Sequence, residues 1–452
     1  MGYAAKPPGH AFAITGYTGD GFIVQNSWGE KWGYFGFAVL TYKDWVENGS
    51  DAWVAVRGAP VNIASSPHTF TKNPLQAVST DFTKRTTSSI GKAIRYDYEH
   101  DEVRPWSEEQ AYRHSLVIGN DGQPKLTMVA AADRDASAYI ICHDHIRQWL
   151  EASSDNHKIA IYAHGGLSAE EDSINRIRVM APYFKANGIY PLFITWKTGF
   201  LESLTSQISD NMKNIFMKAG IDPAGARAKG IFDRWREPVD GAIENFSREF
   251  VVRGIWLEMK ENARYASDRA VIGFPQRGNT RPGGMVILAK MLETLKQDHD
   301  FEIHLVGHSA GSILFGHWMD ELIKRALPID SLTLYAPACT LEFANRHYSK
   351  AQEKRILARE KISIHLMDDE RELADNVGKI YGKSLLYLVS RALEDVHKMP
   401  LLGMAAAWNL EHAGEKDGKF NSVQHRAIKK WVDFAGKGTP GVNRFTYHYS
   451  DI

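Results

Sequence analysis

The sequence has few cysteines, no long apolar run and no excess of charge of either sign. Cys142 and Cys339 are its two cysteines, and they form neither a disulfide framework nor a CxxC metal motif, so we expect two reduced, buried thiols. No apolar stretch reaches the length of a membrane span. Basic and acidic residues number 54 each, which argues against a polybasic nucleic-acid-binding protein and against an acidic disordered one.

The N-terminus lacks the hydrophobic segment of a signal peptide. The opening Met-Gly is not followed by the serine or threonine of a myristoylation site, because Lys6 stands there. No motif for a metal, nucleotide or flavin is visible. The sequence therefore predicts a soluble, cytoplasmic protein without a cofactor, with the reservation that its true N-terminus lies further upstream if the chain is a fragment.

Apolar residues make up 44% of the chain and charged residues 24%, as in ordinary globular proteins. Three regions differ in character. Residues 1–60 are rich in glycine, aromatic and β-branched residues and alternate like antiparallel strands. Residues 61–95 are rich in serine and threonine and show little periodicity, as expected of a linker, and residues 96–452 form the third region.

In the third region, apolar strands alternate with amphipathic helices. Examples of the strands are "KIAIYAHGG", "IYPLFITW", "FEIHLVGHS" and "KISIHLMDD". We expect a hairpin that turns at 120–122, and a long helical insert at about 200–280 interrupts the alternation. The pattern predicts the α/β class with a doubly wound, mostly parallel sheet, preceded by a small antiparallel β segment.

The strongest chemical signal is "GHSAG" at 307–311, a G-x-S-x-G motif between an apolar strand and a helix. The glycines allow a tight strand-to-helix turn in which a side chain at residue 307 or 311 would clash. That turn holds Ser309 Oγ above the sheet, at a helix N-terminus. Ser309 is therefore the candidate nucleophile.

Upstream, His164–Gly165–Gly166 ends another predicted strand. Glycine lets this loop approach a substrate closely, so the backbone N–H groups of Gly165 and Gly166 are candidates for stabilising an oxyanion. The second donor expected of such a motif is the N–H of Ala310, which follows the nucleophile.

An acid and then a histidine should follow the serine in the chain. Asp368 and Asp369 end the strand "KISIHLMDD", where the acid is expected. Asp369 is the preferred acid, Asp368 is a near-equal alternative, and Asp375 ranks third. The aspartate that is not the acid would cap the next helix. His425, just before the last predicted helix, is the expected base. His412 is its main rival, and the other late histidines are His347, His365, His397 and His448.

These motifs resemble the α/β-hydrolase superfamily over residues 96–452. The resemblance implies that Ser309 attacks an acyl carbon, that His425 takes its proton and that Asp369 orients the imidazole. It also implies an ester or other acyl substrate and places the insert where such enzymes carry a lid. The insert has an apolar face that suits a lid, although a helical cap that only covers the sheet edge fits equally well. The residues of this face are Phe200, Leu201, Ile208, Met212, Ile215, Phe216 and Met217.

Residues 1–60, which contain "GHAFAITGY" and "NSWGEKWGYFGF" within 9–37, resemble the C-terminal half-domain of papain-like cysteine peptidases. The resemblance implies that His10 is a base, that Asn26 orients it and that Trp28 shields their hydrogen bond. The nucleophilic cysteine of that family lies well upstream, and residues 1–8 leave no room for it. Neither Cys142 nor Cys339 stands in a suitable context.

Three functions remain open. The first is a serine hydrolase of the esterase or lipase kind, joined to an incomplete peptidase half-domain. The second is a cysteine peptidase acting on peptides, whose nucleophile-bearing half lies upstream and for which the hydrolase region is an accessory module. The third is a binding scaffold without catalysis, which requires that Ser309, Asp369 and His425 do not converge.

Overall fold

A computed structural model describes residues 12–26, 32–34, 36–48, 104–129, 133–152, 157–165, 170–196, 232–249, 251–268, 281–375, 377, 381–414, 418–436 and 441–447. The N-terminal part of this set forms a small antiparallel sheet in the order β1-β2-β3, with strands Ala13–Tyr17, Gly21–Gln25 and Phe37–Thr41. Helix α1 (Tyr42–Asn48) follows β3 directly. The antiparallel strands expected in residues 1–60 are confirmed where the structure describes them.

The main sheet has seven strands in the order β10-β9-β8-β7-β5-β6-β4, and every neighbouring pair is parallel. Its strands are, in chain order, β4 (Ser115–Ile118), β5 (Lys158–Ala163), β6 (Ile189–Trp196), β7 (Glu302–His308), β8 (Ser331–Tyr335), β9 (Ile362–Met367) and β10 (Asn443–Tyr447). Helices flank the sheet, so the predicted α/β class is confirmed.

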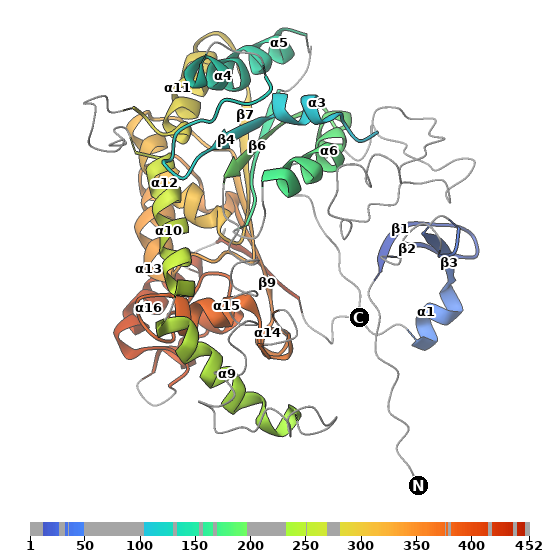
Figure 1. The fold of residues 1–452 in the computed structure, drawn as a ribbon, viewed down its shortest axis with the longest axis vertical. Helices are drawn as coiled ribbons and strands as arrows, with labels where there is room; N and C mark the ends of the chain where they lie inside the picture. Colours follow the sequence, from blue (N-terminus) through green and yellow to red (C-terminus); the bar gives the residue numbers. More distant parts are fainter. Residues whose placement is uncertain are drawn as a thin grey trace.

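The central strands are largely buried because both faces of the sheet are covered. All eight residues of β6 are buried, and so are five of the seven in β7. On one face α12 (Gly311–Lys324) packs against α13 (Leu341–Glu353), which packs in turn against α16 (His425–Gly436). On the opposite face lie α6 (Glu170–Ala186) and α3 (Glu108–Arg113), as Figure 1 shows.

The remaining helical elements surround this core. They are α4 (Arg134–Tyr139), a π-helical turn (Ile140–Asp144), α5 (His145–Ala152), α9 (Phe232–Glu249), α10 (Val251–Ala266), α11 (Gly284–Asp298), α14 (Asp369–Ala374), α15 (Leu385–Leu388), a second π-helical turn (Val389–Leu393), and 3₁₀ turns at Arg359–Lys361, Ala405–Trp408, Leu410–Ala413 and Ser422–Gln424. None of the described helices is long and apolar enough to cross a membrane.

The described part of the predicted insert consists of α9 and α10, and α10 packs against α11 and α12. Asp240 of α9 forms a buried ion pair of 2.6 Å with Lys383. Trp256 of α10 donates a hydrogen bond of 2.8 Å to Glu394. These contacts fix α9 and α10 to the segment that follows α14. The apolar residues expected to form a lid, Phe200 to Met217, lie outside the described residues.

The expected hairpin at 120–122 forms only in part. Lys125 N–H donates to Val117 O at 2.8 Å, and Ile118 and Pro124 form a single antiparallel bridge. Pro124 has no N–H to continue a ladder, so no strand follows the turn.

Candidate active site

Ser309 occupies the sharp junction between β7 and α12. Its backbone is left-handed, with φ of 49°, which costs a non-glycine residue energy and holds the side chain out of both neighbouring elements. Its N–H donates to Tyr335 O at 2.9 Å, and its carbonyl accepts from Ala338 N–H at 3.1 Å. The turn is therefore fixed by backbone bonds to the segment at the end of β8, and the Ser309 side chain remains partly exposed.

The two glycines of the motif are required by packing, as the sequence predicted. A Cβ at Gly307 would lie 2.9 Å from a Leu334 methyl carbon and 3.1 Å from the Phe315 ring. At Gly311 it would lie 2.4 Å from the carbonyl oxygen of Ala163. A side chain at 311 would thus push α12 away from β5.

The strand order changes direction at Ser309. From β5 the chain moves to β6 on one side, and from β7 it moves to β8, β9 and β10 on the other. Ligands of open α/β sheets bind at such a switch point, outside the carboxyl ends of the strands. Ala163 at the end of β5 pairs in register with Gly307 of β7, so the segments that follow these two strands start side by side.

Gly165 lies directly against Ser309. A Cβ placed on it would be 3.0 Å from Ser309 Cβ and 2.9 Å from His308 Nδ1. Ala310 is fully buried, and its N–H has no hydrogen-bond acceptor among the described residues. The structure thus brings Gly165, Ser309 and Ala310 together, while Gly166 lies outside the described residues.

His164 and His308 flank this point and are neutral near pH 7. Burial, with a smaller effect of the nearby charge of Arg176, lowers the pKa of each to about 4. His164 Nδ1–H donates to Gly165 O at 2.7 Å, and its Nε2 accepts from Trp196 N–H at 3.3 Å. Both ring nitrogens of His164 are therefore committed to holding the backbone next to Gly165.

The two candidate acids follow β9 and have different partners. Asp368 is buried, its Oδ1 accepts from Arg371 N–H at 2.6 Å as the cap of α14, and its own N–H donates to Tyr447 O at 3.0 Å. Asp369 accepts from Tyr387 Oη at 2.5 Å and from Lys419 Nζ at 2.6 Å, one on each carboxylate oxygen. The third candidate, Asp375, caps the C-terminal end of α14.

The ends of β7, β8 and β9 are linked in a row. Ser309 N–H bonds to the end of β8, and Ala336 N–H, just after β8, donates to His365 O of β9 at 2.9 Å. Two strand spacings separate β7 from β9, about 10 Å. The segment after β8 therefore lies between the turn at Ser309 and the aspartates that follow β9.

His425 begins α16, two helices away from the α12 helix that Ser309 precedes. It is buried, and its Nε2 has no hydrogen-bond partner among the described residues. Asn345 of α13 donates to Ala427 O at 2.9 Å, which fixes the start of α16 against α13. No described hydrogen bond or ion pair joins His425 to Ser309, Asp368 or Asp369.

The rival histidines have other surroundings. His365 lies within β9, stacks on Tyr335 and Phe445 and shares a hydrogen bond of 2.6 Å with Tyr447 Oη. His347 is on α13, beside Asp320. His397 bonds to Arg391 O, His412 lies against Phe420, and His448 is outside the described residues.

Both thiols are buried, as expected. Burial raises the pKa of Cys142 strongly and that of Cys339 to about 12, so neither is an activated nucleophile. Of the peptidase-like residues, Asn26 is described: it is buried after β2, and its N–H donates to Gly36 O at 2.9 Å. His10 and Trp28 lie outside the described residues.

Sequence reasoning missed two polar residues near the site, Ser173 and Arg176 of α6. No short motif marks them, because they follow the His-Gly-Gly loop as ordinary positions of an amphipathic helix. The described residues contain no group of three His, Cys, Asp or Glu side chains that is arranged to hold a metal ion. No protein-family model, curated protein or solved structure matches the chain.

Proposed function

We propose that the region 96–452 is a serine hydrolase that cleaves esters through Ser309. The observation that carries this proposal is the left-handed backbone of Ser309, at a strand-to-helix junction on the switch point of a parallel sheet. Such a conformation is strained for serine and is concentrated at functional sites. Two further observations support the same role: Gly165 packs against Ser309, and the N–H of Ala310 has no acceptor among the described residues.

In the proposed reaction, Ser309 Oγ attacks the acyl carbon and its proton passes to a histidine. The electron pair of the carbonyl moves onto its oxygen, which the N–H groups of Ala310 and the Gly165 loop stabilise. When the carbonyl re-forms, the C–O bond to the alcohol breaks and the histidine returns the proton to that alcohol. A water molecule then releases the acid by the same steps and regenerates Ser309.

We infer that Asp368 is the acid. It stands directly after β9 and is buried, and Asp369 is engaged in an ion pair with Lys419. Asp368 N–H bonds to Tyr447 O, and the next residue in the sequence is His448. We propose His448 over His425 as the base, because no described hydrogen bond joins His425 to Ser309, Asp368 or Asp369.

The test is active-site labelling of the full chain with a fluorophosphonate, together with hydrolysis of short-chain p-nitrophenyl esters. We expect the label on Ser309 and loss of both labelling and hydrolysis in Ser309→Ala. Ser422→Ala, at an exposed serine, is the matched control and should retain both. Labelling that persists in Ser309→Ala, or a chain that neither labels nor hydrolyses any ester, would refute the proposal.

A further inference from the structure

One cavity among the described residues is large enough to hold a small molecule. Its volume is about 670 Å³, within the usual range of ligand sites. It is lined by residues of α3, α5, the last turn of α6 and the start of β6, and Figure 1 shows α3 and α5 at the same end of the protein. Because all strands of the main sheet are parallel, the start of β6 lies at the opposite end of the sheet from Ser309, which follows β7. This amino-end cavity is therefore separate from the candidate active site.

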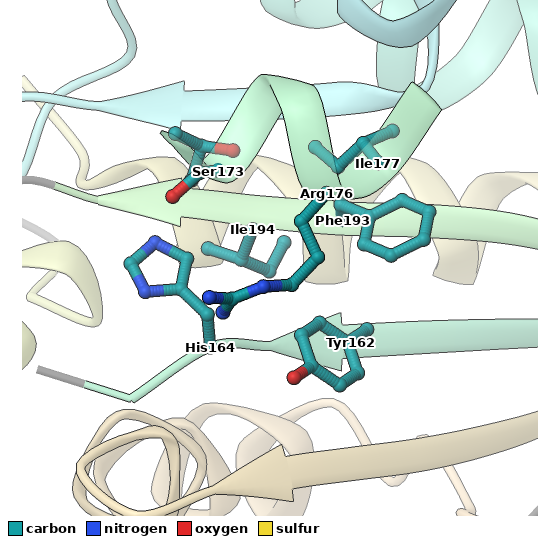
Figure 2. A pocket seen from close by; sticks show the side chains of 8 residues that line it. Tyr162, His164, Ser173, Arg176, Ile177, Phe193 and Ile194 are labelled. Atoms are coloured by element: carbon teal, nitrogen blue, oxygen red, sulfur yellow. The ribbon is translucent and has the colours of Figure 1, made fainter. Parts of the chain in front are cut away.

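The cavity shown in Figure 2 is much smaller. It lies under α6, and Tyr162, His164 and Arg176 are among the residues that line it. Its volume of about 10 Å³ is enough for a single water molecule. Of these two cavities, the amino-end cavity is thus the one that can accept a ligand.

Four aromatic rings follow one another along the amino-end cavity. They belong to Trp106 before α3, His114 at the C-terminal end of α3, Tyr190 of β6 and Trp149 of α5. Their centroids are 4.5, 4.6 and 5.5 Å apart in this order. Trp106 and Tyr190 are buried, whereas His114 and Trp149 are partly exposed. The two buried rings thus support two rings that still offer surface for stacking to a planar ligand.

The two partly exposed rings also carry polar groups without a partner. His114 Nδ1–H donates to Pro191 O at 2.8 Å, and burial lowers the pKa of His114 to about 4, so the ring is neutral near pH 7. Its Nε2 is therefore an acceptor, and no described residue donates to it. The indole N–H of Trp149 likewise has no acceptor in the part of the chain that the structure describes. Residues of the cavity thus supply one free acceptor and one free donor, and a few such groups are what orients a ligand in a pocket.

The lysine, arginine and acidic side chains of the cavity leave one positive charge unbalanced. Arg113 pairs with Glu109 at 2.8 Å, so these two charges offset each other. Lys185 takes part in no ion pair with another described residue, and its Nζ lies 5.9 Å from the centroid of the Trp106 ring. A cation is thus already present at the aromatic rings, where a cationic ligand would otherwise bind. The charge therefore disfavours a cationic ligand and favours an anionic one.

We propose that the amino-end cavity binds a small molecule that combines a flat aromatic ring with an anionic group. The ring packs against His114 and Trp149, an N–H of the ring bonds to His114 Nε2, and the anion lies at Lys185. Aromatic carboxylic acids and nucleoside monophosphates share this chemistry, and the volume of the cavity admits both. Binding at this site does not involve Ser309, so the proposal is independent of the proposed hydrolase.

The first test measures binding of indole-3-acetate and of AMP to the full chain by calorimetry at low salt. We expect at least one of them to bind, and the one that binds identifies the source of the anionic ring compound. The matched probes without charge are indole-3-acetamide and adenosine, and those without an aromatic ring are cyclohexylacetate and ribose 5-phosphate. Loss of the charge should weaken binding about 3- to 10-fold, as for an ion pair at a partly exposed site. Loss of the ring should weaken it at least about 5-fold.

Two results of this comparison would overturn the proposal. In the first, neither indole-3-acetate nor AMP binds. In the second, the probe that lacks the charge or the ring binds as tightly as its complete counterpart.

The second test uses variants and places the probe in the cavity. Lys185→Met, at an exposed residue, should weaken the anionic probe about 3- to 10-fold and change its uncharged counterpart less than about 2-fold. Lys290→Met removes an exposed lysine of α11 and is the matched control, which should bind like the wild type. Trp149→Leu should weaken both probes at least about 5-fold, with thermal unfolding to confirm that it folds. Unchanged binding in Lys185→Met would overturn the proposal.

Ser309→Ala separates this site from the candidate active site. It should bind the probe like the wild type, since Ser309 lies at the other end of the sheet. Loss of binding in Ser309→Ala would place the probe at the candidate active site and overturn the proposal. A wild-type protein that binds the probe through Lys185 but hydrolyses no ester would leave this site and refute the proposed function.

Discussion

Gly165 and Ser309 are packed so closely that a Cβ on Gly165 would lie 3.0 Å from the Ser309 Cβ. Real Cβ atoms do not approach other atoms to within such distances without displacement of a neighbour. The loop after β5 and the turn after β7 therefore have to be considered as one unit. Any side chain at residue 165 changes the position of Ser309 relative to the N–H groups proposed to stabilise the oxyanion.

Gly165→Ala is accordingly expected to lower kcat for ester hydrolysis at least about 10-fold, because misplacement of reacting groups is costly. The protein should still fold, since His164 also anchors this loop. Steady-state kinetics and thermal unfolding check the two statements. Gly241→Ala is the control, because nothing lies within 4 Å of a Cβ at that position of α9, and its activity should be unchanged.

Backbone strain at Ser309 predicts a difference between two inactive variants. Ser309→Ala keeps a Cβ in the left-handed region, whereas Ser309→Gly removes the strain. We expect the glycine variant to be more stable by about 0.5–1 kcal/mol in urea unfolding, the residual after its larger loss of chain entropy. The same comparison at Ala326, which also has a left-handed φ of 50°, should give the same sign, and equal stabilities at both positions would argue against strain.

The two aspartates after β9 should respond differently to removal of charge. Asp368→Asn keeps a good helix cap but loses the carboxylate, so we expect a fall in kcat of at least about 100-fold with the melting temperature nearly unchanged. Asp369→Asn loses the ion pair with Lys419, so its main effect should be on stability. A large fall in kcat for Asp369→Asn, with Asp368→Asn remaining active, would assign the acid to Asp369.

The base is tested by paired substitutions. His448→Ala is expected to abolish turnover, whereas His425→Ala should leave kcat within about 3-fold and chiefly affect the packing of α16. Single-turnover assays and thermal unfolding separate these effects. Loss of activity in His425→Ala with an intact fold would instead support the base that the sequence motif order indicates.

The buried His164 predicts a pH dependence of stability. Its pKa is about 4 in the folded protein and near 6.5 when unfolded, so between these values the unfolded chain binds more protons. The contribution of His164 to the free energy of unfolding is therefore complete above pH 7 and declines as the pH falls below 6.5. At pH 5 it is smaller by about 2 kcal/mol. The free energy of unfolding in urea, measured at pH 7 and pH 5, should differ less for His164→Gln than for the wild type, by about 2 kcal/mol. An unchanged difference would contradict this assignment.

Local features of this protein could be predicted from its sequence and long-range ones could not. The glycines at 307 and 311 indicate a tight turn because their effect is steric and confined to a few residues. Strand β10 was missed, since "NRFTY" is short and mostly exposed in an edge strand. The choice between Asp368 and Asp369 depends on where Lys419 and Tyr387 lie, 50 and 18 residues further along the chain.

The last strand in chain order also has a consequence for how the protein is made. Strand β10 pairs with β9, and the carbonyl of its final residue, Tyr447, accepts the N–H of Asp368. Until residues 443–447 have been synthesised, β9 presents an open edge that is available for pairing with other chains. Completion of the candidate site is therefore a late event of biosynthesis, and truncation before residue 443 should yield a chain that aggregates rather than one that is merely inactive.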